Sequence, residues 1–167
     1  MRDGGTTGCV PRDAAVYEPI YKEGRSQALD SIIQMAATCR QCTAPTCISH
    51  CPAQVNIPKF IGEIANKKFR QAYETLRESN TLAAVCGCVC PAEVQCEGAC
   101  IHQHYHAAVP IRHLQQWVTR KAIEEGWAAE TRASAASSGR RVAVVGAGPA
   151  GIAAAEKLAA AGHAVTL

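Results

Sequence analysis

Two cysteine-rich stretches contain the side chains of this chain that are best suited to chemistry. The first, T-C-R-Q-C-T-A-P-T-C-I-S-H-C-P from Thr38 to Pro52, places four cysteines within thirteen residues. A C-x2-C pair lets two sulfurs face one metal centre from a single turn, so these cysteines are predicted to be ligands rather than separate core residues. The stretch closes with Cys51-Pro52. In the bacterial ferredoxin run the cysteine of such a pair serves the other cluster, which favours two clusters over one.

The second stretch, V-C-G-C-V-C-P-A-E-V-Q-C-E-G-A-C from Val85 to Cys100, repeats the Cys-Pro pair and the last cysteine spacing of the first. If each stretch exchanges its last sulfur with the other, two ligand sets result. The first set is Cys39, Cys42, Cys47 and Cys100, and the second is Cys51, Cys90 and Cys96. A cluster of four irons and four sulfides needs four protein ligands, so the second set lacks one. Either Cys86 or Cys88 supplies it, or a non-cysteine side chain does.

A glycine-rich turn near the end of the sequence is the third motif. A short apolar run at 141–145, predicted to be a buried strand, leads into G-A-G-P-A-G and a helical pattern that Gly162 ends, and residues 164–167 begin another strand. Strand, G-x-G-x-x-G and helix follow each other as a dinucleotide site requires: the glycines allow a tight turn, backbone approach to the pyrophosphate and close helix packing. The expected cofactor-binding residues are Gly146, Gly148, Pro149, Ala150 and Gly151.

The sequence stops at Leu167, just short of the acidic residue that would bind the ribose about 20 residues after the glycines. One strand, helix and strand cannot enclose FAD or NAD, and two lone parallel strands are marginal. We therefore interpret residues 140–167 as the start of a Rossmann-type FAD or NAD domain, and the chain as the front part of a longer flavoprotein. On its own this unit should bind dinucleotide weakly or not at all.

Helical patterns surround the cysteines and must position them. Apolar residues recur at helical spacing from Ser26 toward Cys39, in a helix capped by Asn56 with Pro58 just inside it, and in another at 68–79. The last two form a hairpin that returns the second cysteine stretch to the first. A longer helical pattern begins at Ile111 and ends near Gly126. Between the second stretch and this helix lie His102, His104 and His106, predicted to form a polar loop near the clusters or, alternatively, a metal site.

Composition limits the other functions. With two Phe and two Trp in 167 residues the apolar core is thin, so bound metal is expected to add stability. The net charge of +3 indicates no nucleic-acid partner, and no window approaches the roughly 18 apolar residues of a membrane span. Without a signal peptide pattern we expect a cytoplasmic protein, where dense cysteines indicate metal binding rather than disulfides. The predicted domains are an extended arm (1–24), a mainly α-helical, ferredoxin-like domain with two [4Fe-4S] clusters (25–127), a linker (128–139) and the incomplete Rossmann unit (140–167).

The stretch from Cys39 to about Trp127, followed by V-A-V-V-G-A-G-P-A-G, resembles the N-terminal iron-sulfur domain and first FAD-binding segment of glutamate synthase small (beta) chains and of the N-terminal part of dihydropyrimidine dehydrogenase. The motifs C-x2-C-x4-C-x3-C-P, V-C-P-A-E-V-Q-C-E-G-A-C and L-Q-Q-W carry the resemblance. The resemblance implies that Gln115 completes the second ligand set, with the adjacent Gln116 able to substitute, and that Cys86 and Cys88 are not ligands.

The same resemblance implies the function of the complete protein. NAD(P)H would deliver a hydride to FAD, and electrons would pass singly through two [4Fe-4S] clusters to a partner oxidoreductase subunit or domain, such as a glutamate synthase large chain or a dihydropyrimidine dehydrogenase catalytic part. This segment would contain no catalytic acid, base or nucleophile. Two alternatives stay open: a freestanding ferredoxin-like carrier, which leaves the glycine turn without a role, and a zinc-binding structural or assembly module, which does the same.

Overall fold

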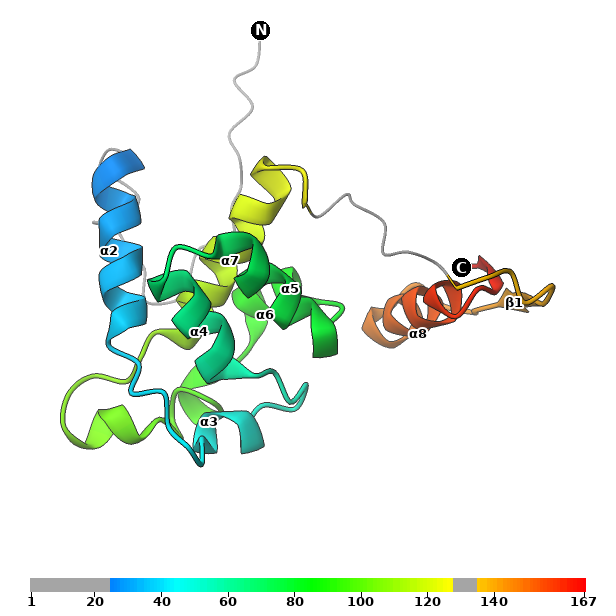
Figure 1. Cartoon of the computed structure of the whole chain (residues 1–167). Helices are drawn as coiled ribbons and strands as arrows, with labels where there is room; N and C mark the ends of the chain where they lie inside the picture. The colour runs from blue at the N-terminus through cyan, green and yellow to red at the C-terminus, as the bar shows by residue number, and fades with distance from the viewer. Residues whose placement is uncertain (1–24, 128–134) are drawn as a thin grey trace, which may run out of the picture.

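The computed structural model of the chain describes residues 25–127 and 135–167 (Figure 1). The predicted arm at 1–24 and residues 128–134 of the predicted linker lie outside the described residues. The first described part is mainly helical. Its helices are α2 (Arg25–Ala37), α3 (Thr46–Ser49), α4 (Ile57–Ala65), α5 (Phe69–Ser79), α6 (Ala83–Val89) and α7 (Ile111–Glu124), with 3-10 turns η1 (Ala92–Val94) and η2 (Ile101–His104).

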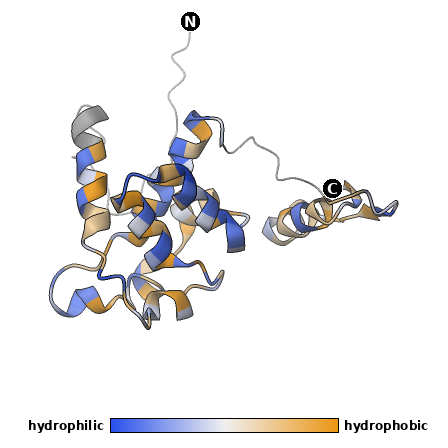
Figure 2. Cartoon of the chain, viewed as in Figure 1, coloured by the Kyte–Doolittle hydropathy of each residue, from blue (hydrophilic) through white to orange (hydrophobic). Residues whose placement is uncertain are grey.

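The core lies where α2, α4, α5 and α7 meet. Phe60, Ile61 and Ile64 of α4 are fully buried, and Ile32 of α2 and Leu114 of α7 pack in the same cluster. Figure 2 shows that each of these helices carries hydrophobic and hydrophilic residues together, as helices with one buried face do. The helical hairpin of α4 and α5 that the sequence predicts is therefore present, and its apolar stripe is core.

Helix α4 begins as its sequence predicts. The Asn56 side chain accepts a hydrogen bond from the backbone N–H of Lys59 at 3.3 Å, and Pro58 occupies the first turn, where its missing N–H costs nothing. Helix α7 ends at Glu124, and the next turn contains Gly126 with a φ of +79°, a left-handed conformation that favours glycine. These boundaries agree with the predicted ones.

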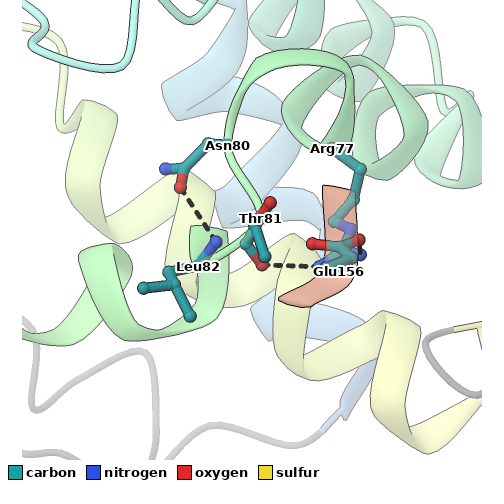
Figure 3. A network of polar contacts seen from close by, with 5 residues as sticks. All are labelled: Arg77, Asn80, Thr81, Leu82 and Glu156. Atoms are coloured by element: carbon teal, nitrogen blue, oxygen red, sulfur yellow. Dashed lines mark hydrogen bonds and ion pairs between the residues drawn. The ribbon is translucent and has the colours of Figure 1, made fainter. Parts of the chain in front are cut away.

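Helix α6 is an element that the sequence patterns did not predict. Its first turn follows Asn80, a buried residue whose side-chain oxygen accepts a hydrogen bond from the Leu82 N–H at 3.0 Å (Figure 3). Along the helix, Gly87 lies against α7: a Cβ at this position would be 3.0 Å from the backbone N and Cα of Gln116. Glycine therefore lets α6, which precedes Cys90, approach α7 closely.

The second described part is a β-α-β unit of β1 (Arg141–Ala143), α8 (Pro149–Ala160) and β2 (Ala164–Thr166). The two strands pair in parallel, with Val142 opposite Val165. The prediction of a buried strand at 141–145 was wrong in two respects: β1 ends at Ala143, and its residues are exposed or half-buried. Two strands and one helix cover too little surface to bury a strand on both faces, and Val145 is 99% exposed.

The β-α-β unit contacts the chain segment before it and helix α5. Residues at the end of the predicted linker already belong to it, because the Ala135 N–H donates to the Ala160 carbonyl and the Ser138 N–H to that of Gly162. Arg77, at the end of α5, forms an ion pair with Glu156 of α8 and also donates to the Thr81 carbonyl (Figure 3). No helix of the described residues is long and apolar enough to cross a membrane.

Candidate metal centre

Four cysteines from both cysteine-rich stretches line one cavity. They are Cys39, Cys42, Cys47 and Cys100, the first ligand set that the sequence predicts. Cys39 lies two residues after the end of α2, Cys47 lies in α3, and Cys100 directly precedes η2. A hydrogen bond from the Thr46 hydroxyl to the Ala99 carbonyl joins the two stretches beside these thiols. The donor set fits a [4Fe-4S] cluster, which takes four thiolates from a folded loop and a distant cysteine.

The thiols of this set influence one another electrostatically. Burial raises the pKa of the Cys47 thiol to about 11, and the Cys100, Cys39 and Cys42 thiols raise it further because thiolates repel. Burial likewise raises the pKa of Cys39, with contributions from Cys42 and Cys100. These thiols are therefore protonated at neutral pH when no metal is bound, and metal binding must displace their protons.

The remaining wall of the cavity is mostly apolar. Its residues outside the thiols include Ile57, Pro58, Ile61, Val109 and Ile111. Arg40 and His102 also line it, and the Arg40 guanidinium lies 4.7 Å from the ring centre of Tyr105. An apolar shell of this kind limits solvent access, which is one of the factors that set the potential of an iron-sulfur centre.

The cysteines of the second predicted set influence one another electrostatically. Burial raises the pKa of the Cys90 thiol to about 11 and that of Cys96 to about 12, and in both cases repulsion from Cys51 contributes. Cys90 ends α6, where its backbone turns from helical to extended. The turn that follows Cys96 requires glycine, because a Cβ on Gly98 would lie 2.3 Å from the Glu93 carbonyl oxygen. Cys51 of the first stretch is thus close enough to Cys90 and Cys96 of the second to raise the pKa of both thiols, and their shared cluster stays a prediction.

The four candidates for the eighth ligand all lie where α6 meets α7. The buried Gln115 side chain donates to the Ala83 carbonyl at 2.7 Å, and the Gln116 side chain donates to the Cys88 sulfur at 3.6 Å. Cys86 interacts with Cys90 through a side-chain hydrogen bond. Of the four candidates, Cys86 is the one that these contacts link to a member of the second set, and the assignment of the eighth ligand to Gln115 stays a prediction.

The predicted histidine loop forms η2 and the turn after it. The rings of His102 and His106 are 5.4 Å apart at their centres, and Nδ1 of His102 is 2.7 Å from the Ala107 carbonyl oxygen. Among residues 25–127 and 135–167, no three cysteine, histidine or carboxylate side chains are placed to hold a single metal ion. The alternative of a mononuclear site formed by His102, His104 and His106 has no support in this geometry.

The glycine-rich turn has the backbone that its sequence predicts. Gly146 has a φ of +103°, which favours glycine, and a Cβ on Gly151 would lie 1.9 Å from the Gly146 carbonyl oxygen. Gly148 precedes α8, and a Cβ there would meet no atom within 4 Å, so the side facing it is open. Pro149 and Ala150 form the first turn of α8, a helix N-terminus suited to phosphate groups.

Two residues near the second set were not singled out from the sequence. Glu97 accepts a hydrogen bond from the Arg112 N–H, and the Arg112 side chain donates to the Cys90 carbonyl. Glu97 follows Cys96 directly, and this adjacency was the one available signal. Its partner is fifteen residues further along the chain, which no local pattern indicates.

Comparison with known proteins decides the family. The family model described as dihydropyrimidine dehydrogenase domain II, 4Fe-4S cluster, matches residues 18–127. The chain belongs to this family. It is 38% identical over 133 residues to the glutamate synthase [NADPH] small chain of Azospirillum brasilense, covering 79% of this chain and 27% of that protein. It is also 38% identical over 135 residues to the NAD-dependent dihydropyrimidine dehydrogenase subunit PreT of Escherichia coli K12, covering 81% and 32%.

The small chain of glutamate synthase from Escherichia coli K12 is 36% identical over 144 residues, which cover 86% of this chain and 29% of that protein. The chain thus spans less than a third of the length of these curated relatives. The motifs predicted a resemblance to glutamate synthase small chains and to dihydropyrimidine dehydrogenase, and the comparisons confirm it. They also confirm a domain of a 4Fe-4S family. The number of clusters, the flavin and the nicotinamide remain predictions.

Proposed function

We propose that this chain is the electron-transfer segment of an NAD(P)H-dependent iron-sulfur flavoprotein oxidoreductase, holding two [4Fe-4S] clusters between FAD and a partner subunit or domain. The observation that carries the proposal is the cavity lined by Cys39, Cys42, Cys47 and Cys100, in a chain that belongs to a 4Fe-4S family. When bound, such clusters accept and release one electron at a time.

The chain's own residues would hold and insulate these groups. The first cluster would be held by the four cavity thiols, and the second by Cys51, Cys90, Cys96 and Gln115. In the first site, Ile57, Ile61 and Val109 would form the apolar side of the cavity and limit the access of water to the half-buried sulfurs. The proposed electron transfer needs no catalytic acid, base or nucleophile from the described side chains of this segment.

The glycine turn supports the flavin half of the proposal. The positive φ of Gly146 and the close approach of Gly151 to its carbonyl are what a strand, turn and helix need to present a helix N-terminus to a pyrophosphate. We infer that β1, α8 and β2 begin an FAD-binding domain of the complete protein. The glutamate synthase relative is named for NADPH and the PreT relative for NAD, so the proposed nicotinamide is NAD(P)H.

The test is the metal and sulfide content of the chain purified and reconstituted without oxygen. Two [4Fe-4S] clusters predict about eight iron and eight acid-labile sulfide per chain. Cys47→Ser and Cys96→Ser should each reduce both to about four, because each removes a ligand from a different set. Cys9→Ser is the matched control, because Cys9 lies outside both cysteine-rich stretches and belongs to neither predicted ligand set.

Each outcome separates the candidate functions. Zinc without sulfide would overturn the proposal in favour of a zinc-binding structural module. About eight iron in Cys47→Ser or Cys96→Ser would show that the assigned ligand sets are wrong. A freestanding ferredoxin-like carrier would give the same iron content, but it predicts no second G-x-G-x-x-G beyond Leu167, whereas a flavoprotein predicts an acidic residue and that second motif in the longer sequence.

A further inference from the structure

Helix α7 begins without a cap from its own sequence. Its N-cap position is Pro110, which has no side-chain acceptor, and no side-chain cap is formed there. The acceptor comes instead from Glu97, whose Oε1 accepts the Arg112 N–H at 2.8 Å and which also takes a backbone hydrogen bond from Ile111. A carboxylate at this end also faces the positive end of the helix dipole. The loop after Cys96 is thereby fastened to the start of α7.

Arg112 makes the complementary connection. It lies in the first turn of α7, and its guanidinium donates to the Cys90 carbonyl at 3.3 Å. Its charge interacts favourably with both Glu97 and the Cys90 thiol. Glu97 in turn repels the Cys96 thiolate and so helps to raise the pKa of that thiol, after the larger effect of burial. Two side chains therefore connect the end of α6, the loop after η1 and the beginning of α7.

We propose that Glu97 and Arg112 are positioning residues that hold Cys90, Cys96 and the helix bearing Gln115 at the spacing the second cluster requires. This inference rests on the proposed function. Gln115 is three residues after Arg112, so one helical turn separates the fastened end of α7 from the predicted ligand. The hydrogen bonds of Glu97 and Arg112 form a polar bridge between these segments. The segments have few apolar contacts to hold them, since Val89 and Val94 on either side of Cys90 are 68% and 75% exposed.

The bridge also gives the second cluster two opposite nearby charges. A carboxylate beside Cys96 stabilises the oxidised cluster, and a guanidinium beside Cys90 stabilises the reduced one. Removing each charge should therefore shift the reduction potential in opposite directions, which loss of a merely structural contact would not do. Glu97→Gln keeps an oxygen that can accept the α7 N–H groups, whereas Glu97→Ala leaves them without an acceptor.

The experiment measures iron, sulfide and reduction potentials of the reconstituted 167-residue chain. We expect Glu97→Ala to hold about four irons instead of about eight, and Glu97→Gln to keep about eight with the potential of one cluster raised. Arg112→Met should lose part of the iron of the second site, because the contact with the Cys90 carbonyl is gone, and should lower the potential of the cluster that remains. Glu124→Gln and Arg120→Met are the controls, since both residues are exposed on α7. Both should leave the iron content unchanged and the potentials near wild type.

Several results would overturn the inference. One is Glu97→Ala retaining about eight irons with wild-type potentials. Another is Glu97→Gln and Arg112→Met shifting the potential in the same direction or not at all, which decides the matter even if Glu97→Ala fails to fold. A wild-type chain with about four irons, or with zinc, would instead refute the proposed second cluster itself, so the two failures are distinguishable.

Discussion

Substituting Gly87 by alanine tests how tightly α6 must pack on α7. The new Cβ would lie 3.0 Å from the backbone N and Cα of Gln116, whereas carbon atoms in contact normally lie about 3.5–4.0 Å apart. The neighbours are backbone atoms of α7, so they cannot move aside by changing a rotamer. Relief requires the two helices to separate by about 0.5–1 Å.

Two opposing terms determine the stability of Gly87→Ala. Replacing glycine by alanine inside a helix gains up to about 1 kcal/mol of helix propensity. Forcing an extra carbon into a packed contact costs about 1–3 kcal/mol. We expect the second term to dominate, giving a net loss of about 0–2 kcal/mol in the free energy of unfolding, together with a lower iron content because Cys90 moves away from α7.

Urea unfolding of the reconstituted chain, with iron analysis of the same samples, measures both effects. Ala84→Gly is the control, because Ala84 is exposed on the same helix and its replacement reports the propensity term alone. A different result would refute this reasoning. If Gly87→Ala gained about as much unfolding free energy as Ala84→Gly lost, and kept its full iron content, only helix propensity would have changed. The close approach of α6 and α7 would then not constrain the site.

Three further predictions follow from other contacts. Phe60→Ala should destabilise the chain by about 3–5 kcal/mol in urea unfolding, because Phe60 is fully buried in the core, and a loss below about 1 kcal/mol would contradict its central place. Gly151→Ala should disorder the turn, because its Cβ would meet the Gly146 carbonyl at 1.9 Å, and loss of the amide exchange protection of α8 would show this. In a double-mutant cycle, the ion pair of Arg77 with Glu156 should contribute about 1 kcal/mol or less, since both side chains are about a quarter exposed, and high salt should reduce it.

The elements with strong local signals were predictable from sequence. Asn56 and Pro58 mark the start of α4 by chemistry that acts within three residues, and the glycines from Gly146 to Gly151 mark their turn by conformations that other residues rarely adopt. Helix α6 has no such signal. Its sequence, A-A-V-C-G-C-V, contains glycine and two valines, which are poor helix formers, so its helical state depends on packing against α7.

The candidate site was also predictable only in part from the sequence. Repeated Cys-Pro pairs and equal spacings suggested which cysteines share a set, because the sulfurs of a cluster must come from close positions in sequence plus one distant segment. The hydrogen bond between Glu97 and Arg112 could not be predicted from the sequence, because it depends on how the loop after Cys96 folds back onto α7. For the same reason, spacing alone left Cys86, Cys88 and a non-cysteine ligand equally open.

The composition of α7 gives a physical argument about where that eighth ligand lies. This helix buries His113, Gln115, Gln116 and Thr119 beside Leu114, although apolar residues would pack there at lower cost. Burying an amide is tolerated when its hydrogen bonds are made, as Gln115 does with the Ala83 carbonyl. Gln115 and Gln116 are the two of these that contact α6, whereas the Thr119 hydroxyl donates to the Gln115 and Gln116 carbonyls of its own helix. Two buried amides at this contact are the physical reason for predicting that α7, through Gln115 or Gln116, supplies the eighth ligand.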